Sequence, residues 1–171
     1  AGDYVITRTF TATDDCGNAT SATQTITIID TTAPDFTSIP ADYTAECSDA
    51  HPMDEASATD NCGEVVITVE AVNTNGACAG DYVITRTFTA TDDCGNATSA
   101  TQTITIIDTT APELSIPADY TAECSDAHPM DEASATDNCG EVVITVVEVT
   151  TDGACAGDYV ITRTFTATDD C

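Results

Sequence analysis

Residues 1–34 read AGDYVITRTFTATDDCGNATSATQTITIIDTTAP, and the same stretch returns unchanged at residues 79–112. A third copy starts at Ala156, and residues 41–69 also return without change as residues 118–146. The three starts are 78 and 77 residues apart, so the chain of 171 residues holds about two periods of a tandem repeat. Any site in this repeat is therefore present once per copy.

The repeat carries the two-residue alternation of β-strands and no helical period. In the second copy Tyr82, Ile84 and Phe88 fall on one face, and threonines fall on the other. Shorter alternating runs lie at residues 43–47, 56–59, 65–70 and 101–106. Turns rich in Asp, Asn and Gly separate them. Six or seven short strands in about 78 residues predict an all-β fold, a compact antiparallel sandwich.

The sequence Asp-Thr-Thr-Ala-Pro is the natural boundary between repeats, at residues 30–34 and again at 108–112. Proline fixes its own backbone and extends the residue before it, so this linker should be short and stiff. We therefore expect residues 1–29 to be the C-terminal hairpin of a partial repeat and residues 30–107 a complete one. Residues 108–171 should form a repeat that lacks its last strand.

The net charge of the chain argues against two classes of binding partner. Thirty acidic residues against three basic ones give a formal charge of -27, which would repel nucleic acid and anionic membranes. No apolar run is long enough to insert into a membrane. Cations are the better partners, and targeting or anchoring signals are expected outside these residues.

Three motifs in fixed order resemble the hyalin-repeat (HYR) type of immunoglobulin-like domain. They are the Asp-Thr-Thr-Ala-Pro opening, Ala-Thr-Asp-Asn-Cys-Gly at residues 58–63, and Phe-Thr-Ala-Thr-Asp-Asp-Cys-Gly-Asn at residues 88–96. The resemblance implies tandem immunoglobulin-like domains of secreted and cell-surface proteins, used for adhesion or spacing, with no catalytic residues to carry over. Arg86 departs from it, because such strands more often place an apolar residue there.

Nine cysteines fall at four fixed positions per repeat, which predicts disulfides in an oxidising, extracellular setting. A strand of about 30 Å separates Cys78 from Cys94, and too few residues follow the strand after Cys62 for a return to Cys78. Pairing within a repeat then leaves Cys47 with Cys78 and Cys62 with Cys94, and in the next copy Cys124 with Cys155 and Cys139 with Cys171. The partner of Cys16 would lie upstream of residue 1. Linkage between chains is the alternative, and zinc is disfavoured because no C-x-x-C pair occurs.

Oxygen-bearing side chains should gather at the end of the complete repeat that holds the linker. Such oxygens are the ligands of Ca²⁺, and the candidates are Asp30, Asp35, Asp60, Asn61, Asp92, Asp93 and Asn96. The competing interpretation is that these residues only cap turns. No EF-hand spacing is present, so the calcium prediction rests on composition.

Other polar residues have structural interpretations. Arg86 shares a face with Ile84 and Phe88, so we expect a partly buried ion pair with a carboxylate such as Glu64 or Glu70. His51 and His128 are expected on surface loops. No nucleophile beside a base, zinc-binding histidine pair or phosphate loop occurs, so we do not expect an enzyme.

Together these features predict an extracellular or cell-surface structural protein, a rod, stalk or filament whose partners are further copies of itself. The alternative is a calcium-dependent adhesin that binds a glycan or another cell surface. A third hypothesis is an appendage of a secreted enzyme. The long unchanged blocks favour the structural role, because binding modules tend to diversify their exposed loops.

Overall fold

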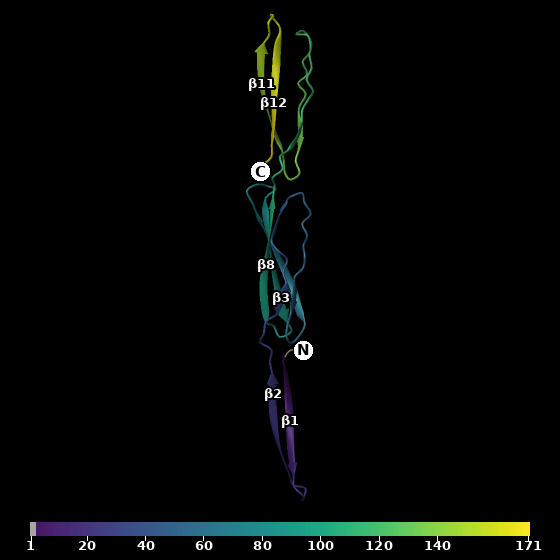
Figure 1. Ribbon diagram of the computed structural model, residues 1–171, viewed down its shortest axis with the longest axis vertical. Helices are drawn as coiled ribbons and strands as arrows, with labels where there is room; N and C mark the ends of the chain where they lie inside the picture. Colours follow the sequence, from purple (N-terminus) through teal and green to yellow (C-terminus); the bar gives the residue numbers. More distant parts are fainter. Residues whose placement is uncertain (1–2) are drawn as a thin grey trace. The chain divides into compact units, whose positions relative to one another are not determined.

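The computed structural model describes residues 3–171, and all its regular structure is β-strand (Figure 1). The strands are β1 (Tyr4–Thr13), β2 (Ala19–Ile28), β3 (Asp35–Ser38), β4 (Tyr43–Glu46), β5 (Ser57–Thr59), β6 (Val65–Asn75), β7 (Tyr82–Asp92), β8 (Ala97–Ile107), β9 (Glu113–Ser115), β10 (Ser134–Thr136), β11 (Val143–Asp152) and β12 (Tyr159–Thr168). The described part of the chain has no helix that could span a bilayer.

The middle repeat has six strands in two sheets, as predicted for an immunoglobulin-like sandwich. One sheet has the order β4-β8-β7-β6, with β4 parallel to β8 from the pair Tyr43 and Ile104 onward. The other sheet is the short antiparallel pair β3 and β5. The hairpins β1–β2 and β11–β12 repeat the long-strand pairing with ten antiparallel residue pairs each. The predicted all-β, immunoglobulin-like fold is therefore confirmed.

The core is small and lies on the predicted face of β7. Phe88 and Ala90 are fully buried, and Ile84 clusters with Ile104 and Ile106 of β8. The identical residues of β1 are exposed along the whole strand, because no second sheet covers that hairpin among residues 3–171. The alternation therefore selects a face, and the second sheet decides whether that face is buried.

The structure corrects the predicted ion pair of Arg86 with Glu64. Arg86 is only 6 % exposed, and its Nη1 donates to the carbonyl oxygen of Asp54 at 2.8 Å and to Oε1 of Gln102 at 2.9 Å. Its guanidinium also lies 4.9 Å from the centre of the Phe88 ring, a cation–π contact. Glu64 is exposed to solvent, so the inward guanidinium is satisfied by uncharged acceptors instead.

A related ion pair does form in the third repeat. Nε of Arg163 lies 3.9 Å from Oε2 of Glu148, directly opposite on the neighbouring strand. The middle repeat has Ala71 at the position of Glu148. Nη1 of Arg163 also donates to the carbonyl oxygen of Asp131 at 2.8 Å, as Arg86 does to that of Asp54. The two copies thus share this carbonyl partner and differ in the side chain that the arginine meets, Gln102 or Glu148.

Contacts divide the chain into two compact units that do not coincide with single repeats. The first runs to Asp42 and adds Pro52–Val72 and Thr85–Thr103. The second comprises Tyr43–His51, Asn73–Ile84 and Ile104–Cys171. Each unit contains one Asp-Thr-Thr-Ala-Pro linker with the loops and turns around it. The boundaries at residues 29/30 and 107/108 remain predictions, and residues 1–2 of the partial repeat lie outside the described residues.

Candidate functional site

Each linker is held by the same hydrogen bonds in both units. We call the linker, together with the loops and turns that contact it, a joint: the first joint surrounds Asp30 and the second surrounds Asp108. The N–H of Asp30 donates to Oδ1 of Asp3 at 2.7 Å, and the N–H of Asp108 donates to Oδ1 of Asp81 at 3.0 Å. In turn, Oδ1 of each linker aspartate accepts the N–H of the threonine two residues later, at 3.1 and 3.2 Å.

Aspartates also organise the turns that meet the linker. In the first joint the carboxylate of Asp92 accepts the N–H of Cys94 at 2.8 Å and both the N–H and the side-chain amide of Asn96. Desolvation would raise the pKa of Asp92, but the hydrogen bonds from Asn96, Cys94 and Gly95 outweigh it and lower that pKa. Asn96 also donates to the carbonyl oxygen of Asp30 at 3.2 Å, which ties turn to linker.

Three carboxylates converge in each joint. The oxygens of Asp30, Asp60 and Asp92 lie within 4.8 Å of one another in the first joint, and the same holds for Asp108, Asp137 and Asp169 in the second. One oxygen each of Asp60, Asp108 and Asp137 is buried and has no hydrogen-bond partner in the described structure. This repeated cluster is the strongest candidate site for a cation.

Like charge perturbs the cluster in the second joint. The N–H of Thr110 tends to lower the pKa of Asp108, but desolvation and the charges of Asp137, Asp169 and Glu46 outweigh it, so that pKa is raised. Glu46 is fixed nearby because its carboxylate accepts both the N–H and the hydroxyl of Thr109. The joint therefore concentrates negative charge that its own residues do not neutralise.

The structure brings together part of the predicted calcium set. Asp30, Asp60 and Asp92 meet, and Asn96 reaches the linker beside them. Asn61 instead directs its side-chain amide to Sγ of Cys62 at 2.9 Å. Asp35 pairs with Thr59 at the start of β3, and Asp93 is exposed; neither belongs to the three-carboxylate cluster. The prediction of bound calcium itself is not tested by this geometry.

The predicted disulfide frame is wrong, because the bonds cross the joint. Cys47 bonds Cys139 with their Cα atoms 5.8 Å apart, and Cys78 bonds Cys171 at 5.3 Å. The predicted Cys47–Cys78 and Cys139–Cys171 bonds are therefore excluded, and Cys62–Cys94 and Cys124–Cys155 are not formed among residues 3–171.

The disulfides join consecutive repeats because, within the second unit, the end of one repeat faces the end of the next. The loops with Cys47 and Cys78 lie at one end of the middle repeat and face the turns with Cys139 and Cys171 of the next repeat. The N–H of Ala79 donates across the same interface to Oδ2 of Asp170 at 2.9 Å. The signal for this frame was present in the sequence, since each repeat places two cysteines at each end.

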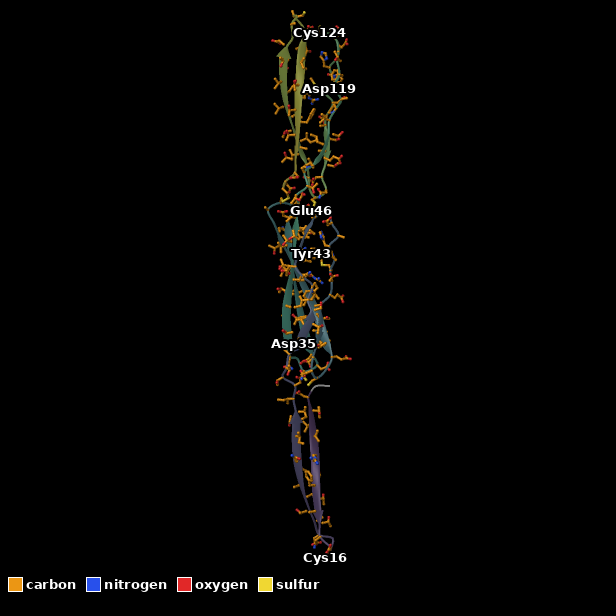
Figure 2. The ribbon with its side chains drawn as sticks, in the orientation of Figure 1. Cys16, Asp35, Tyr43, Glu46, Asp119 and Cys124 are labelled. Atoms are coloured by element: carbon orange, nitrogen blue, oxygen red, sulfur yellow. A yellow bond between two sulfur atoms is a disulfide. The ribbon has the colours of Figure 1, made fainter. Side chains whose placement is uncertain are left out.

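The remaining thiols have different surroundings. Desolvation and the charges of Asp30 and Asp60 raise the pKa of Cys62 in the first joint. A hydrogen bond involving Asp3 lowers the pKa of Cys94, but desolvation and nearby negative charge outweigh it and raise that pKa. Raised pKa values make these two thiols poor nucleophiles at neutral pH. Cys16, Cys124 and Cys155 are exposed, and Cys16 stands at the tip of the β1–β2 hairpin (Figure 2).

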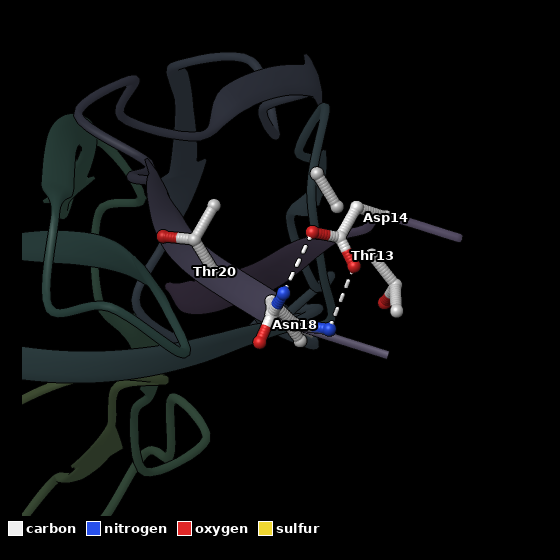
Figure 3. Close-up of a pocket in the computed structure, with 6 residues that line it drawn as sticks. Thr13, Asp14, Asn18 and Thr20 are labelled. Atoms are coloured by element: carbon white, nitrogen blue, oxygen red, sulfur yellow. Dashed lines mark hydrogen bonds between the residues drawn. The ribbon is translucent and has the colours of Figure 1, made fainter. Parts of the chain in front are cut away.

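The turn at Cys16, at the tip of the β1–β2 hairpin, has the same sequence as the Asp92–Asn96 turn and is exposed to solvent. Asn18 donates its N–H and its side-chain amide to the two carboxylate oxygens of Asp14, each at 2.8 Å (Figure 3). Those bonds lower the pKa of Asp14. A shallow hollow of about 430 Å³ lies at this tip, lined by residues that include Thr13 and Thr20. In the equivalent turn of the first joint, the side-chain amide of Asn96 also donates to the linker carbonyl of Asp30.

Comparison with known proteins identifies the repeat. Residues 36–106 match the model of the HYR-like domain with 4 cysteines, a range that holds Cys47, Cys62, Cys78 and Cys94. Hyalin of Strongylocentrotus purpuratus is 31 % identical over 159 residues, which is 84 % of this chain and 13 % of Hyalin. The chain thus spans well under two thirds of that relative's length. The four cysteines and the all-β fold of this stretch agree with the match, so residues 36–106 form a domain of the HYR-like family with 4 cysteines.

Proposed function

We propose that this protein is an extracellular structural repeat protein, part of a rod, stalk or filament built from further copies of the same repeat. The observation that carries the proposal is the pair of disulfides across the second joint. Bonds of this kind persist outside the cytosol, where thiols are not kept reduced. The HYR-like family assignment and the similarity to Hyalin support this setting.

The joint has the construction that a tension-bearing link needs. Consecutive repeats are connected there by three covalent paths: the linker after Asp108 and the bonds Cys47–Cys139 and Cys78–Cys171. Three separate attachments prevent the two repeat ends from hinging about a single chain crossing. Tension along the chain is then shared by disulfides and backbone instead of passing through one peptide linker.

Calcium at the joints is the second part of the proposal. Asp60, Asp108 and Asp137 each use one carboxylate oxygen to cap a turn or linker and leave the other buried without a partner. Turn capping therefore accounts for one oxygen of each carboxylate. The other, unpartnered oxygens favour a bound cation. Ca²⁺ is the best match, because it takes several hard oxygen ligands in flexible geometry. The bound ion would neutralise the charge that raises the pKa of Asp108.

Electron microscopy of native material tests the structural role. We expect chains of domains that run continuously as filaments or stalks, and isolated compact particles would reject the proposal. A glycan array is the companion measurement. Specific, calcium-dependent glycan binding by material without filaments would favour the adhesin alternative.

Thermal unfolding tests the calcium proposal separately. A ligand at 100 times its Kd stabilises the folded state by about 2.7 kcal/mol, so the Tm in millimolar Ca²⁺ should exceed that in EDTA. Asp137→Asn is the matched variant, since it keeps an acceptor for the N–H of Cys139 but removes charge from the cluster. Equal Tm values in EDTA and Ca²⁺ for the unaltered protein would reject the calcium site.

A further inference from the structure

We propose that the outer edge of β6 is an interaction surface for a second copy of this chain, and that two such edges pair antiparallel into one continuous sheet. The sheet order β4-β8-β7-β6 places β6 last, and no further strand pairs with it among residues 3–171. This inference deepens the proposed structural role and rests on it, because it names the surface by which separate chains would associate side by side. The disulfides of the second joint instead connect repeats along one chain.

The open edge belongs to the complete repeat and does not depend on where the sequence begins or ends. The next repeat is attached behind residues 108–112, and its strands pair only among themselves, β9 with β10 and β11 with β12. β11 takes the place of β6 in that repeat and receives no strand from the middle repeat. By repetition, β6 receives none from the repeat before it. A strand that pairs with this edge therefore comes from another chain.

β6 lacks the features by which natural sheets protect an open edge. Proline, charged side chains and very short edge strands discourage pairing with another chain. The eleven residues of β6 include no proline, lysine or arginine and one acidic residue, Glu70. The opposite edge of the same sheet is protected, because β4 has only four residues. The long edge of β6 is thus a template on which another extended strand can form main-chain hydrogen bonds.

The side chains along this edge are apolar and exposed. Val66 is 64 % exposed and Val72 is 53 % exposed, on the face opposite to that of the half-buried Val65 and Ile67. The same positions of β11 are Val143 and Val149, and both are also exposed. Pairing of two edges would remove part of this apolar surface from water, which favours association.

The distribution of charge favours a second copy as the partner. The chain has 30 acidic residues, and only one of them lies in β6. Two copies repel each other over most of their surface, so they approach at the lowest cost where each carries least charge. A basic partner would be attracted to the acidic joints instead. The edge therefore fits an uncharged extended strand, and the same edge of a second copy supplies one.

An antiparallel pair of β6 strands centred on Val69 suits both copies equally. In that register Val66 of each copy lies opposite Val72 of the other, and Glu70 lies opposite Thr68. Valines therefore face valines, and no carboxylate faces another directly. The contact is isologous, so both copies contribute the same residues. β11 permits the same register, with Val143 opposite Val149.

Charge reversal at these four valines tests the inference, after the free thiols are blocked with iodoacetamide. In sedimentation equilibrium the unaltered chain should associate reversibly, and NaCl should strengthen the association by screening the repulsion between acidic copies. V66E/V72E/V143E/V149E and V66K/V72K/V143K/V149K each place like charges opposite one another and should weaken association at least about tenfold. Mixed in equal amounts, the two variants should associate again, because glutamate then faces lysine.

V5K supplies the matched control, since Val5 is an exposed valine of β1 away from this edge. V5K should associate like the unaltered chain, and its mixture with the glutamate variant should not restore association of that variant. Hydrogen exchange locates the contact: the amides of residues 65–73 should exchange more slowly at high protein concentration, and those of residues 4–13 should not change. Circular dichroism checks that every variant keeps its β-structure.

Several results would overturn the edge contact. They are an unaltered chain that stays monomeric at every concentration, charge variants that associate like the unaltered chain, a mixture that stays monomeric, or protection confined to the β1–β2 hairpin. Electron microscopy separates this failure from failure of the proposed function. Native filaments that are only one chain thick would reject the contact and leave the structural role intact. Native material without filaments would instead reject the structural role.

Discussion

Serine substitution of Cys47 and Cys78, singly and together, measures what the second joint contributes to stability. Cys47 bonds Cys139 and Cys78 bonds Cys171, so C47S breaks one bond and C47S/C78S breaks two. Pairing within a repeat would predict the opposite pattern, since Cys47 and Cys78 would then share one bond. The comparison therefore tests the pairing and its energy together.

The expected magnitude follows from the loops that the bonds close. Sequence separations of 92 and 93 residues give about 4.6 kcal/mol for either bond alone in the chain-entropy model. With one bond in place, the other closes a shorter path of about 63 residues through the first, worth about 4.3 kcal/mol. C47S should therefore lower the free energy of unfolding by about 4 kcal/mol, and C47S/C78S by about 9 kcal/mol.

Guanidinium unfolding under non-reducing conditions is the assay, and C139S supplies the matched control. C47S, C139S and C47S/C139S should all lose the same amount, because each removes only the Cys47–Cys139 bond. Mapping of alkylated peptides should find the Cys78–Cys171 bond intact in all three. The reasoning is refuted if C47S/C139S loses about twice as much as C47S while C47S/C78S loses no more than C47S.

Three further substitutions, one of them with a matched control, probe the core and the joint. Arg86→Ala removes two hydrogen bonds and a ring contact of a buried side chain, and it should lower the free energy of unfolding by about 3–5 kcal/mol in chemical unfolding. Arg8→Ala, at the exposed copy of the same position, should change that free energy by less than about 0.5 kcal/mol. Equal losses would contradict the buried role of Arg86. Gly80→Ala would place its Cβ 2.8 Å from Cβ of Asp108, so we expect a loss of about 1–3 kcal/mol and a lower Tm, and an unchanged Tm would show that the joint is less closely packed. The raised pKa of Asp108 favours its protonated form in the folded state, so stability should fall as pH rises above the ordinary value near 3.8. In EDTA, Tm measured from pH 4 to 7 should therefore fall further for the unaltered protein than for Asp108→Asn, and parallel profiles would exclude this charge effect.

The strand pattern was predictable because alternation is a local property. Threonines alternating with Tyr82, Ile84 and Phe88 specify one inward face, and the structure buries that face in β7. The partner of Arg86 was not predictable in the same way. The Asp54 carbonyl belongs to a loop 32 residues away, and a periodic pattern gives a face without naming what lies opposite.

The cysteine partners were missed for a different reason. Elimination of pairs that bracket a strand was sound, and it placed Cys47 and Cys78 at one end and Cys62 and Cys94 at the other. In a tandem repeat, however, the turns of one copy recur in the next, so Cys62 and Cys139 are equivalent by sequence. The linker length decides between them. Only five residues, Asp108 to Pro112, separate the repeats, which is short enough to bring facing ends within disulfide range.

Identical residues in β1 and β7 show which features a single copy encodes. The guanidinium of Arg8 lies 5.1 Å from the Phe10 ring centre in the exposed hairpin, close to the 4.9 Å of the buried Arg86–Phe88 pair. The turn bonds of Asp14 and Asp92 also agree within 0.2 Å in the two copies. Hairpin, turn and ring contact are therefore local, and they form with or without a covering sheet.

The joint, in contrast, belongs to neither repeat alone. An excised repeat of residues 30–107 would keep its own strands, but Cys47 and Cys78 would lose their partners and Asp81 would lose the N–H of Asp108 that it accepts. Stability in such an array is a sum of repeat terms and neighbour terms, and here the neighbour term includes two disulfides while the repeat term rests on a small core. The blocks copied without change, residues 79–112 and 118–146, contain both the core strands β7 and β8 and the linker and turns of the second joint, so each copy carries the repeat term together with its side of the neighbour term.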